Sequence, residues 1–139
     1  MSNNVIKGCK FHHVALQTSD FDKSFKFYTE GLGFEVYRQW VGGTGKRLAL
    51  INIGNDQYFE IFSDGDARTE SHKDSGSYIH LALEVEDSKA AYERALQYGA
   101  KEMDKAPAQY TLPSEPPINA VISFVKGPDG EELEFFQVL

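Results

Sequence analysis

The order of hydrophobic and polar residues predicts one series of elements that occurs twice along the chain. In the first half, apolar and polar residues alternate over residues 10–18, which is typical of a β-strand. A helix is expected next, because large apolar residues recur at helical spacing: Phe21, Phe25, Tyr28 and Leu32. Gly31 and Gly33 are expected to end it. Further strands are predicted at Phe34–Val41, Arg47–Ile53 and Gln57–Phe62.

The second half repeats this series after a polar segment. Residues 63–77 are rich in Ser, Asp and Gly and are predicted to link the halves; His72 within them is assigned no role. Strands are expected at Tyr78–Val85, Ala100–Met103, Asn119–Lys126 and Glu131–Val138. A helix is expected from a cap at Asp87 to about Tyr98, with an inner face of Ala91, Tyr92, Ala95 and Leu96. The proline-rich residues 104–117 are expected to form a loop.

A short motif marks the start of each half. In both copies a histidine precedes an apolar strand, and an aspartate seven residues later opens a helix. Aligning His13 with His80 therefore places Asp20 on Asp87. Because each half would leave an apolar sheet face open, the two must pack together. We expect a single domain over residues 1–139, with one module at about 10–62 and the other at about 78–138.

Composition excludes several classes of function. A chain of 139 residues can bury one core, and its net charge of −7, without a basic stripe, argues against a nucleic-acid partner. A single cysteine, Cys9, excludes an internal disulfide and a multi-cysteine metal site, and it fits a reducing compartment. The first residues have no apolar leader segment, and no later run reaches membrane-spanning length. We therefore expect a cytoplasmic protein without a membrane partner.

Two histidines and two glutamates occupy equivalent places in the two halves. They are His13 and Glu60 in the first half, and His80 and Glu134 in the second. Each glutamate stands between two apolar residues of a predicted strand, so its carboxylate points away from the core. His12 competes with His13, but period-two alternation selects His13, because the residue aligned with His12 is Ile79.

This set of side chains suits a metal ion. Two carboxylates buried together resist ionisation, because like charges repel in a medium of low dielectric. A divalent cation removes that cost, and two imidazole nitrogens with two carboxylate oxygens suit Zn, Ni, Fe, Mn or Co. We predict one divalent metal ion bound by the four side chains, with positions open for water or substrate.

These landmarks resemble the vicinal oxygen chelate superfamily over nearly the whole chain, from about residue 10 to 138. The matching residues are His13-Val14-Ala15-Leu16, Asp20, Ser24, Phe27-Tyr28, Gly31-Leu32-Gly33-Phe34, Phe59-Glu60-Ile61, His80-Leu81-Ala82-Leu83-Glu84-Val85 and Gly127-Pro128-Asp129-Gly130-Glu131-Glu132-Leu133-Glu134. The resemblance implies an α+β fold of paired βαβββ modules, whose curled mixed sheets form a cavity centred on a metal.

Within this superfamily, the His–Glu–His–Glu set is similar to that of glyoxalase I, the lactoylglutathione lyases. That likeness implies a small-molecule substrate, the hemithioacetal of methylglyoxal and glutathione or of another thiol. It also implies Glu134 as the main base that removes a proton alpha to the carbonyl, with Glu60 as a ligand that assists. Members of this size commonly form homodimers. The sequence leaves open whether the four ligands meet within one chain or across two.

Departures from the pattern keep other functions open. Glyoxalase I enzymes tend to have Arg in place of Gln17 and Asn near Asp64, so glutathione as the carrier is in question. Three cations are candidates for a different anion clamp, although a solvated position is the simpler expectation: Arg38, Arg47 and Lys126. Trp40 and Tyr110 are expected in the core, or else as stacking surface in the pocket. The alternatives are an acyl-CoA epimerase, an extradiol dioxygenase-like enzyme, and a non-catalytic binding or resistance protein.

Overall fold

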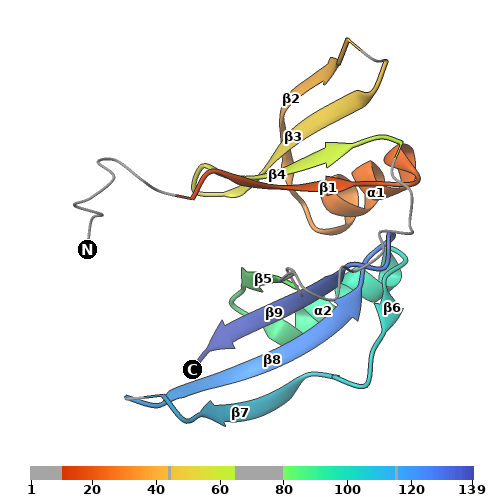
Figure 1. Cartoon of the computed structure of the whole chain (residues 1–139). Helices are drawn as coiled ribbons and strands as arrows, with labels where there is room; N and C mark the ends of the chain where they lie inside the picture. The colour runs from red at the N-terminus through yellow and green to blue at the C-terminus, as the bar shows by residue number, and fades with distance from the viewer. Residues whose placement is uncertain (1–10, 44, 65–79, 115) are drawn as a thin grey trace, which may run out of the picture.

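The first half of the protein is a sheet of four strands. The computed structural model describes residues 11–43, 45–64, 80–114 and 116–139. The strands of the first sheet are β1 (His13–Gln17), β2 (Glu35–Val41), β3 (Arg47–Gly54) and β4 (Gln57–Phe62). Their order is β1-β4-β3-β2, with β1 parallel to β4 and the other pairs antiparallel. The β2–β3 hairpin projects away from the second half (Figure 1).

The second half forms a separate sheet with the same central topology. Its strands are β5 (Leu81–Glu84), β6 (Lys101–Glu102), β7 (Ala108–Leu112), β8 (Ile118–Lys126) and β9 (Glu132–Val138). Their order is β5-β9-β8-β6, with β7 also paired to β8, and β5 runs parallel to β9 as β1 does to β4. The expected α+β class with mixed sheets is confirmed. The expected strand Tyr78–Val85 and the linker 63–77 lie partly outside the described residues.

Each half has one helical segment, and both begin as the repeat predicts. Asp20 precedes α1 (Phe21–Lys26) and accepts a hydrogen bond from the backbone N–H of Lys23 at 3.1 Å. Asp87 precedes α2 (Ser88–Gln97) and accepts from the N–H of Ala90 at 2.9 Å. Because these N–H groups have no partner within the helix, the aspartates satisfy them and fix where each helix starts.

The first helix does not continue as a regular α-helix. Its last turn is π-helical, η1 (Phe27–Gly31), in which the Leu32 N–H bonds to the Phe27 carbonyl at 3.0 Å. The wider turn alters which side chains face inward. Phe27, which the helical spacing left off the inner face, is 2% exposed, beside the fully buried Tyr28.

The loop expected at residues 104–117 is wrong over β7. Ala108–Leu112 pairs antiparallel with Ile118–Ile122 of β8, in the place that β2 has beside β3. Pro107 and Pro113 flank the strand and so remove no ladder hydrogen bond from within it. Prolines at the ends of a strand and prolines in a loop give the same composition, so composition alone does not distinguish a strand here from a loop.

The two halves share one hydrophobic core. Phe59 and Ile61 of β4 belong to the same buried cluster as Leu133 and Phe135 of β9. The helical segments also meet: Arg94 of α2 donates to the carbonyl of Gly31 at 3.0 Å. The approach there is close, since a Cβ added at Gly31 would lie 2.8 Å from the Cβ of Tyr98.

A polar cluster also joins the halves, at the turn between β8 and β9. The Asp129 carboxylate accepts hydrogen bonds from the Ser19 N–H at 2.8 Å and from the Ser24 hydroxyl at 2.6 Å. Burial acts to raise the pKa of Asp129, but these hydrogen bonds outweigh it and hold the pKa below its usual value. Beside it, the Tyr28 hydroxyl donates to Glu131, and burial raises the pKa of both of these groups.

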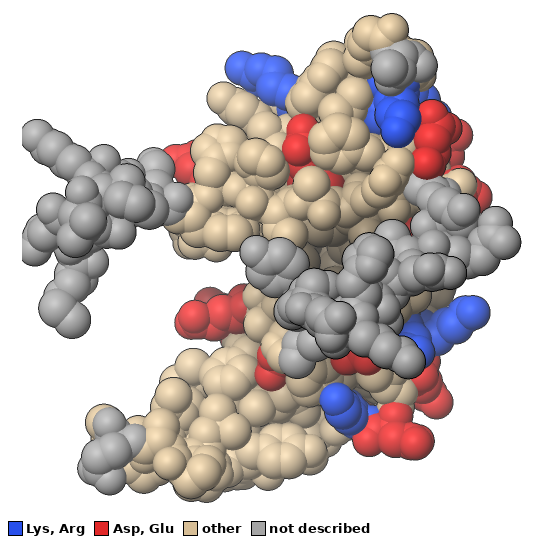
Figure 2. Space-filling view, in the orientation of Figure 1, with Lys and Arg blue, Asp and Glu red and all other residues tan. Residues whose placement is uncertain are grey.

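The charged side chains of one face of the described residues are seen in Figure 2. Lysine and arginine side chains are scattered over the face in Figure 2 and do not gather into one patch. Among the described residues, no helix has the length and apolar character needed to cross a membrane.

Candidate functional site

In the first half, the structure places His13 beside Glu60 on the face of the sheet that points away from the core. Val14 and Leu16 pack against the core, so the alternating residues His13 and Ala15 lie on the other face. Glu60 shares that face, because Phe59 and Ile61 on either side of it are buried. The His13 Nε2 and Glu60 Oε2 atoms are 3.4 Å apart.

In the second half, His80 and Glu134 form the equivalent pair. His80 lies just before β5, and its Nε2 is 3.0 Å from Oε2 of Glu134 on β9. Leu133 and Phe135 point into the core, so Glu134 points to the opposite face. Glu134 is nevertheless only 8% exposed, because side chains of β7 and β8 surround it.

A pocket of about 290 Å³ opens beside Glu134. Apolar and aromatic side chains form most of its wall: Tyr110, Leu112, Ile122 and Phe124. Lys105 supplies a cation, with its Nζ 4.4 Å from the centre of the Phe124 ring. The ring of His80 packs edge to face against that of Phe124, with the two ring centres 5.5 Å apart. Sequence reasoning missed Lys105 and Phe124, because nothing in the pattern showed that β7 and its approach cover Glu134.

The two pairs do not come together within one chain. Over the described ranges, no group of three or more His, Cys, Asp or Glu side chains is placed to hold a metal ion. The topology explains this: the shared core lies between the inner faces of the two sheets, and each pair lies on the opposite face of its own sheet. The described residues of one chain therefore present two separate His–Glu pairs, which we call half-sites: His13 with Glu60, and His80 with Glu134.

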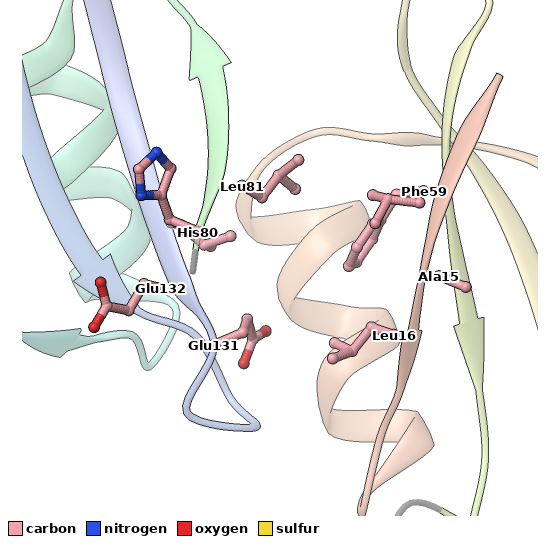
Figure 3. Close-up of a pocket in the computed structure, with 9 residues that line it drawn as sticks. Ala15, Leu16, Phe59, His80, Leu81, Glu131 and Glu132 are labelled. Carbon is pink, nitrogen blue, oxygen red and sulfur yellow. The ribbon is translucent and has the colours of Figure 1, made fainter. Parts of the chain in front are cut away.

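The cleft between the halves is a different, mostly apolar space. It has a volume of about 260 Å³ and includes Leu16, Phe59, Leu81 and Glu131 in its wall. His80 also contributes to its wall, and in Figure 3 Leu81 and Phe59 project toward the space while the ring of His80 turns away from its centre.

The donor set fits a metal ion. Two ligand atoms of one ion, each about 2.1 Å from it, are about 3.0 to 3.4 Å apart at coordination angles between square and tetrahedral. The observed nitrogen–oxygen separations, 3.4 Å at His13–Glu60 and 3.0 Å at His80–Glu134, agree with this spacing. Both separations are also those of a His–carboxylate ion pair.

The residues that depart from the glyoxalase pattern contact each other. The Gln17 side-chain amide donates to the backbone carbonyl of Asp64 at 3.0 Å. Asp64 has a left-handed backbone with φ of 63°, which is uncommon for a residue other than glycine. The Gln17 amide thus fixes the backbone that follows β4. It is neutral, whereas the arginine of the glyoxalase pattern would provide a positive charge.

The three cations that are candidates for an anion clamp have different surroundings in the structure. Arg47 is engaged by Asp22 at 2.8 Å, with its guanidinium over the ring of Phe21. Lys126 is the last residue of β8, opposite Lys101 and Glu132 in the strand ladder. Arg38 shares a row across the first sheet with Leu50 and Glu60, so it lies on the face of the His13–Glu60 pair.

The expectation that Trp40 and Tyr110 pack in the core is wrong. Trp40 is 43% exposed on β2, and Tyr110 is 46% exposed on β7. β2 is the last strand in the order of the first sheet, and β7 pairs with β8. Tyr110 does line the pocket beside Glu134, as the alternative expectation has it. Aromatic character alone does not distinguish a core strand from an outer one.

The comparisons with known proteins identify the family. A model of the Glyoxalase/Bleomycin resistance protein/Dioxygenase superfamily matches residues 10–135. The chain belongs to this superfamily. The resemblance drawn from the His13 and His80 motifs is therefore confirmed at the level of the superfamily.

Individual members of this superfamily are similar over nearly all of the chain. Lactoylglutathione lyase of Neisseria meningitidis serogroup A is 30% identical over 130 residues, which cover 90% of this chain and 88% of that protein. The solved structure of SMU.1112c has a TM-score of 0.72 at 27% identity and covers 94% of this chain and 100% of its own. The glyoxalase family protein from Enterococcus faecalis has a TM-score of 0.70 at 26% identity, with coverage of 92% and 97%. These relatives support an enzyme-like member of the superfamily.

Proposed function

We propose that the protein is a metal-dependent lyase of the glyoxalase I type, which moves a proton between neighbouring carbons of a thiol adduct. One observation carries the proposal: each sheet presents a His–Glu pair, at metal-ligand spacing, on the face opposite the core. The names of relatives such as the Neisseria lactoylglutathione lyase support the same chemistry. In this proposal His13, Glu60, His80 and Glu134 hold one divalent ion, of Zn, Ni, Co, Mn or Fe.

The two glutamates have different roles in this proposal. A bound divalent ion would draw negative charge toward two neighbouring oxygens of the substrate and so acidify the adjacent C–H bond. Glu134 is the proposed base, because it is 8% exposed and lies in the wall of the mostly apolar pocket beside Phe124, where a substrate could contact it. It takes the proton from the carbon alpha to the carbonyl and returns it to the neighbouring carbon. Glu60 is the proposed ligand that assists from the first half.

The proposal includes a homodimer with shared sites. Since the two pairs of one chain lie on faces turned away from their common core, a complete set of four requires the first sheet of one copy against the second sheet of another. These faces also carry exposed apolar side chains, including Tyr37, Trp40 and Tyr110, which a second copy would cover. A two-fold symmetric pair would form two identical sites.

Mixing two inactive variants tests this arrangement. One variant carries His13→Ala with Glu60→Gln, and the other carries His80→Ala with Glu134→Gln. After unfolding together and refolding, about a quarter of the wild-type zinc sites and activity should return, because half of random dimers are mixed and each has one intact site of two. Recovery near zero would contradict shared sites, provided that each refolded sample contains dimers by light scattering. The wild-type chain, refolded alone, is the control for yield.

The substrate is tested separately. We expect isomerisation of the methylglyoxal–glutathione hemithioacetal by protein supplied with Ni, Zn or Co. Metal binding without this activity would move the proposal to other thiol adducts, because Gln17 supplies no positive charge for a glutamyl carboxylate. Protein that binds none of these metals would overturn the proposal. Turnover of acyl-CoA epimers or catechols would favour the epimerase or dioxygenase alternatives.

Two wider expectations belong to the same proposal. Residues 1–139 are treated as one domain made of two modules, because both halves contribute to a single buried cluster. A cytoplasmic location is proposed from the single cysteine, which fits a reducing compartment.

A further inference from the structure

His12, just before β1, contacts the proposed metal ligand beside it. Its Nδ1 lies 2.8 Å from Nδ1 of His13, and the two rings meet edge to face, with centres 5.1 Å apart. The His12 side chain reaches this position because the regular strand begins only at His13, so the strict alternation of faces does not apply before it.

His12 is held in place by a second strand. Its backbone carbonyl accepts from the N–H of Tyr58 on β4 at 2.9 Å, and its ring lies 5.1 Å from the ring of Tyr58. Tyr58 is 7% exposed and sits opposite His13 in the ladder between β1 and β4. A hydrogen-bond partner fixed in this way can orient its neighbour.

The chemistry of two imidazoles at this distance limits their tautomers. A neutral imidazole has one N–H and one nitrogen lone pair, so a contact between two Nδ1 atoms needs one donor and one acceptor. If His13 donates from Nδ1, its lone pair is left on Nε2, the atom that faces Glu60. That is the tautomer required of a histidine that binds metal through Nε2.

We propose that His12 is a positioning residue, which accepts the Nδ1–H of His13 and so holds the His13 Nε2 lone pair ready beside Glu60. The inference rests on the proposed metal site. It also distinguishes the two half-sites: the residue before His80 is Ile79, whose side chain has no atom that can accept a hydrogen bond.

Two substitutions separate hydrogen bonding from packing. His12→Phe keeps an aromatic ring against Tyr58 but has no acceptor. His12→Asn replaces Nδ1 by an amide oxygen at a similar distance from the backbone and restores the acceptor. Zinc alone is the probe, with its affinity measured by competition against a chromophoric chelator. Long-range ¹H–¹⁵N NMR spectra report which nitrogen of His13 carries the proton.

We expect His12→Phe to weaken zinc binding by about 10- to 100-fold, the usual effect of losing a partner behind a metal ligand. The Nδ1–H signal of His13 should also change, and His12→Asn should restore both the affinity and the signal. Equal weakening by the two variants would overturn the inference and would instead indicate that the imidazole of His12 itself binds metal or packs. Unchanged affinity and spectra in His12→Phe would overturn it as well.

The same experiment distinguishes the inference from the proposed function. Wild-type protein that binds no zinc would overturn the metal site, and the positioning role with it. Wild-type protein that binds zinc regardless of the residue at position 12 would overturn only the role of His12. Circular dichroism and thermal unfolding of His12→Phe would verify that the fold is retained.

Discussion

The two half-sites have similar chemistry but different surroundings. In the first half, the side chain of His13 is 42% exposed, and β2, at the far side of the sheet, is exposed along its whole length. In the second half, the side chain of His80 is 31% exposed, and Glu134 lies at the wall of a pocket with Lys105 and Phe124. The repeated sequence therefore supplies the same pair twice. The carboxylates are buried to a similar degree, with side chains 13% and 11% exposed, but Glu134 also lies in the wall of a pocket.

This difference suggests a division of roles. A base works best where the reacting groups are held in place, and the pocket beside Glu134 offers a place for a substrate. In the first half, His13 contacts His12, whose ring lies beside that of Tyr58. Repeats of this kind can thus keep the same His–Glu pair while the residues around the pair differ.

The largest expected effect comes from the two carboxylates. Glu134→Gln should lower kcat by roughly 10³- to 10⁴-fold, because the proton would have no base, and added metal should not restore it. Glu60→Gln should also abolish turnover at limiting metal, but by lowering occupancy, so that excess metal restores part of it. Steady-state rates against metal concentration distinguish the two.

Glu132→Gln is the matched control for these variants, since Glu132 lies on the same strand two residues before Glu134. It should keep the wild-type rate within about threefold, as expected for a residue outside the proton transfer. Rates like those of the wild type in both Glu60→Gln and Glu134→Gln would contradict the mechanism.

A smaller effect is expected where the halves are joined. Asp129→Ala removes the acceptor of the Ser19 and Ser24 hydrogen bonds and should lower the free energy of unfolding by about 1–3 kcal/mol, measured in urea. Because the folded pKa of Asp129 lies below its usual 3.8, its contribution is present above that pH and is lost as the pH falls. The difference in stability between wild type and Asp129→Asn should therefore shrink below pH 3.8. A difference that grows with acid would contradict this linkage.

The smallest expected effect concerns recognition of the substrate. Lys105→Ala should raise KM by about tenfold for hemithioacetals whose thiol carries a carboxylate, and little for the corresponding amides, because one charge contact is lost. Arg38→Ala, which changes a cation on the exposed β2, should change KM by less than about twofold. Equal effects of both substitutions would contradict the idea that the enclosed half-site selects the substrate.

The sequence predicted most of the fold because its signals are local. Asp20 and Asp87 cap their helices as expected, since a cap depends on a few neighbouring N–H groups. The alternation around Glu60 and Glu134 also predicted which face each carboxylate occupies, because the strand period is two. The roles of these residues as ligands stay a prediction.

What the sequence missed depends on contacts between distant segments. Nothing local distinguishes β7 from a proline-rich loop until Ile118–Lys126 is available as its partner. The π-helical turn at Phe27–Gly31 likewise depends on how the first helix fits the shared core. A sequence repeat does not show how its two copies are oriented. The separation of the two His–Glu pairs follows only from which face of each sheet packs into the shared core.

The close approach of Gly31 to Tyr98 has a consequence for recombination between related proteins. A chimaera that joins the first half of one family member to the second half of another inherits the two sides of this contact from different parents. It should pack well only if the donor of residues 1–62 keeps glycine at this position, or if the donor of the other half has a side chain smaller than tyrosine opposite it. One glycine would then govern which halves are interchangeable.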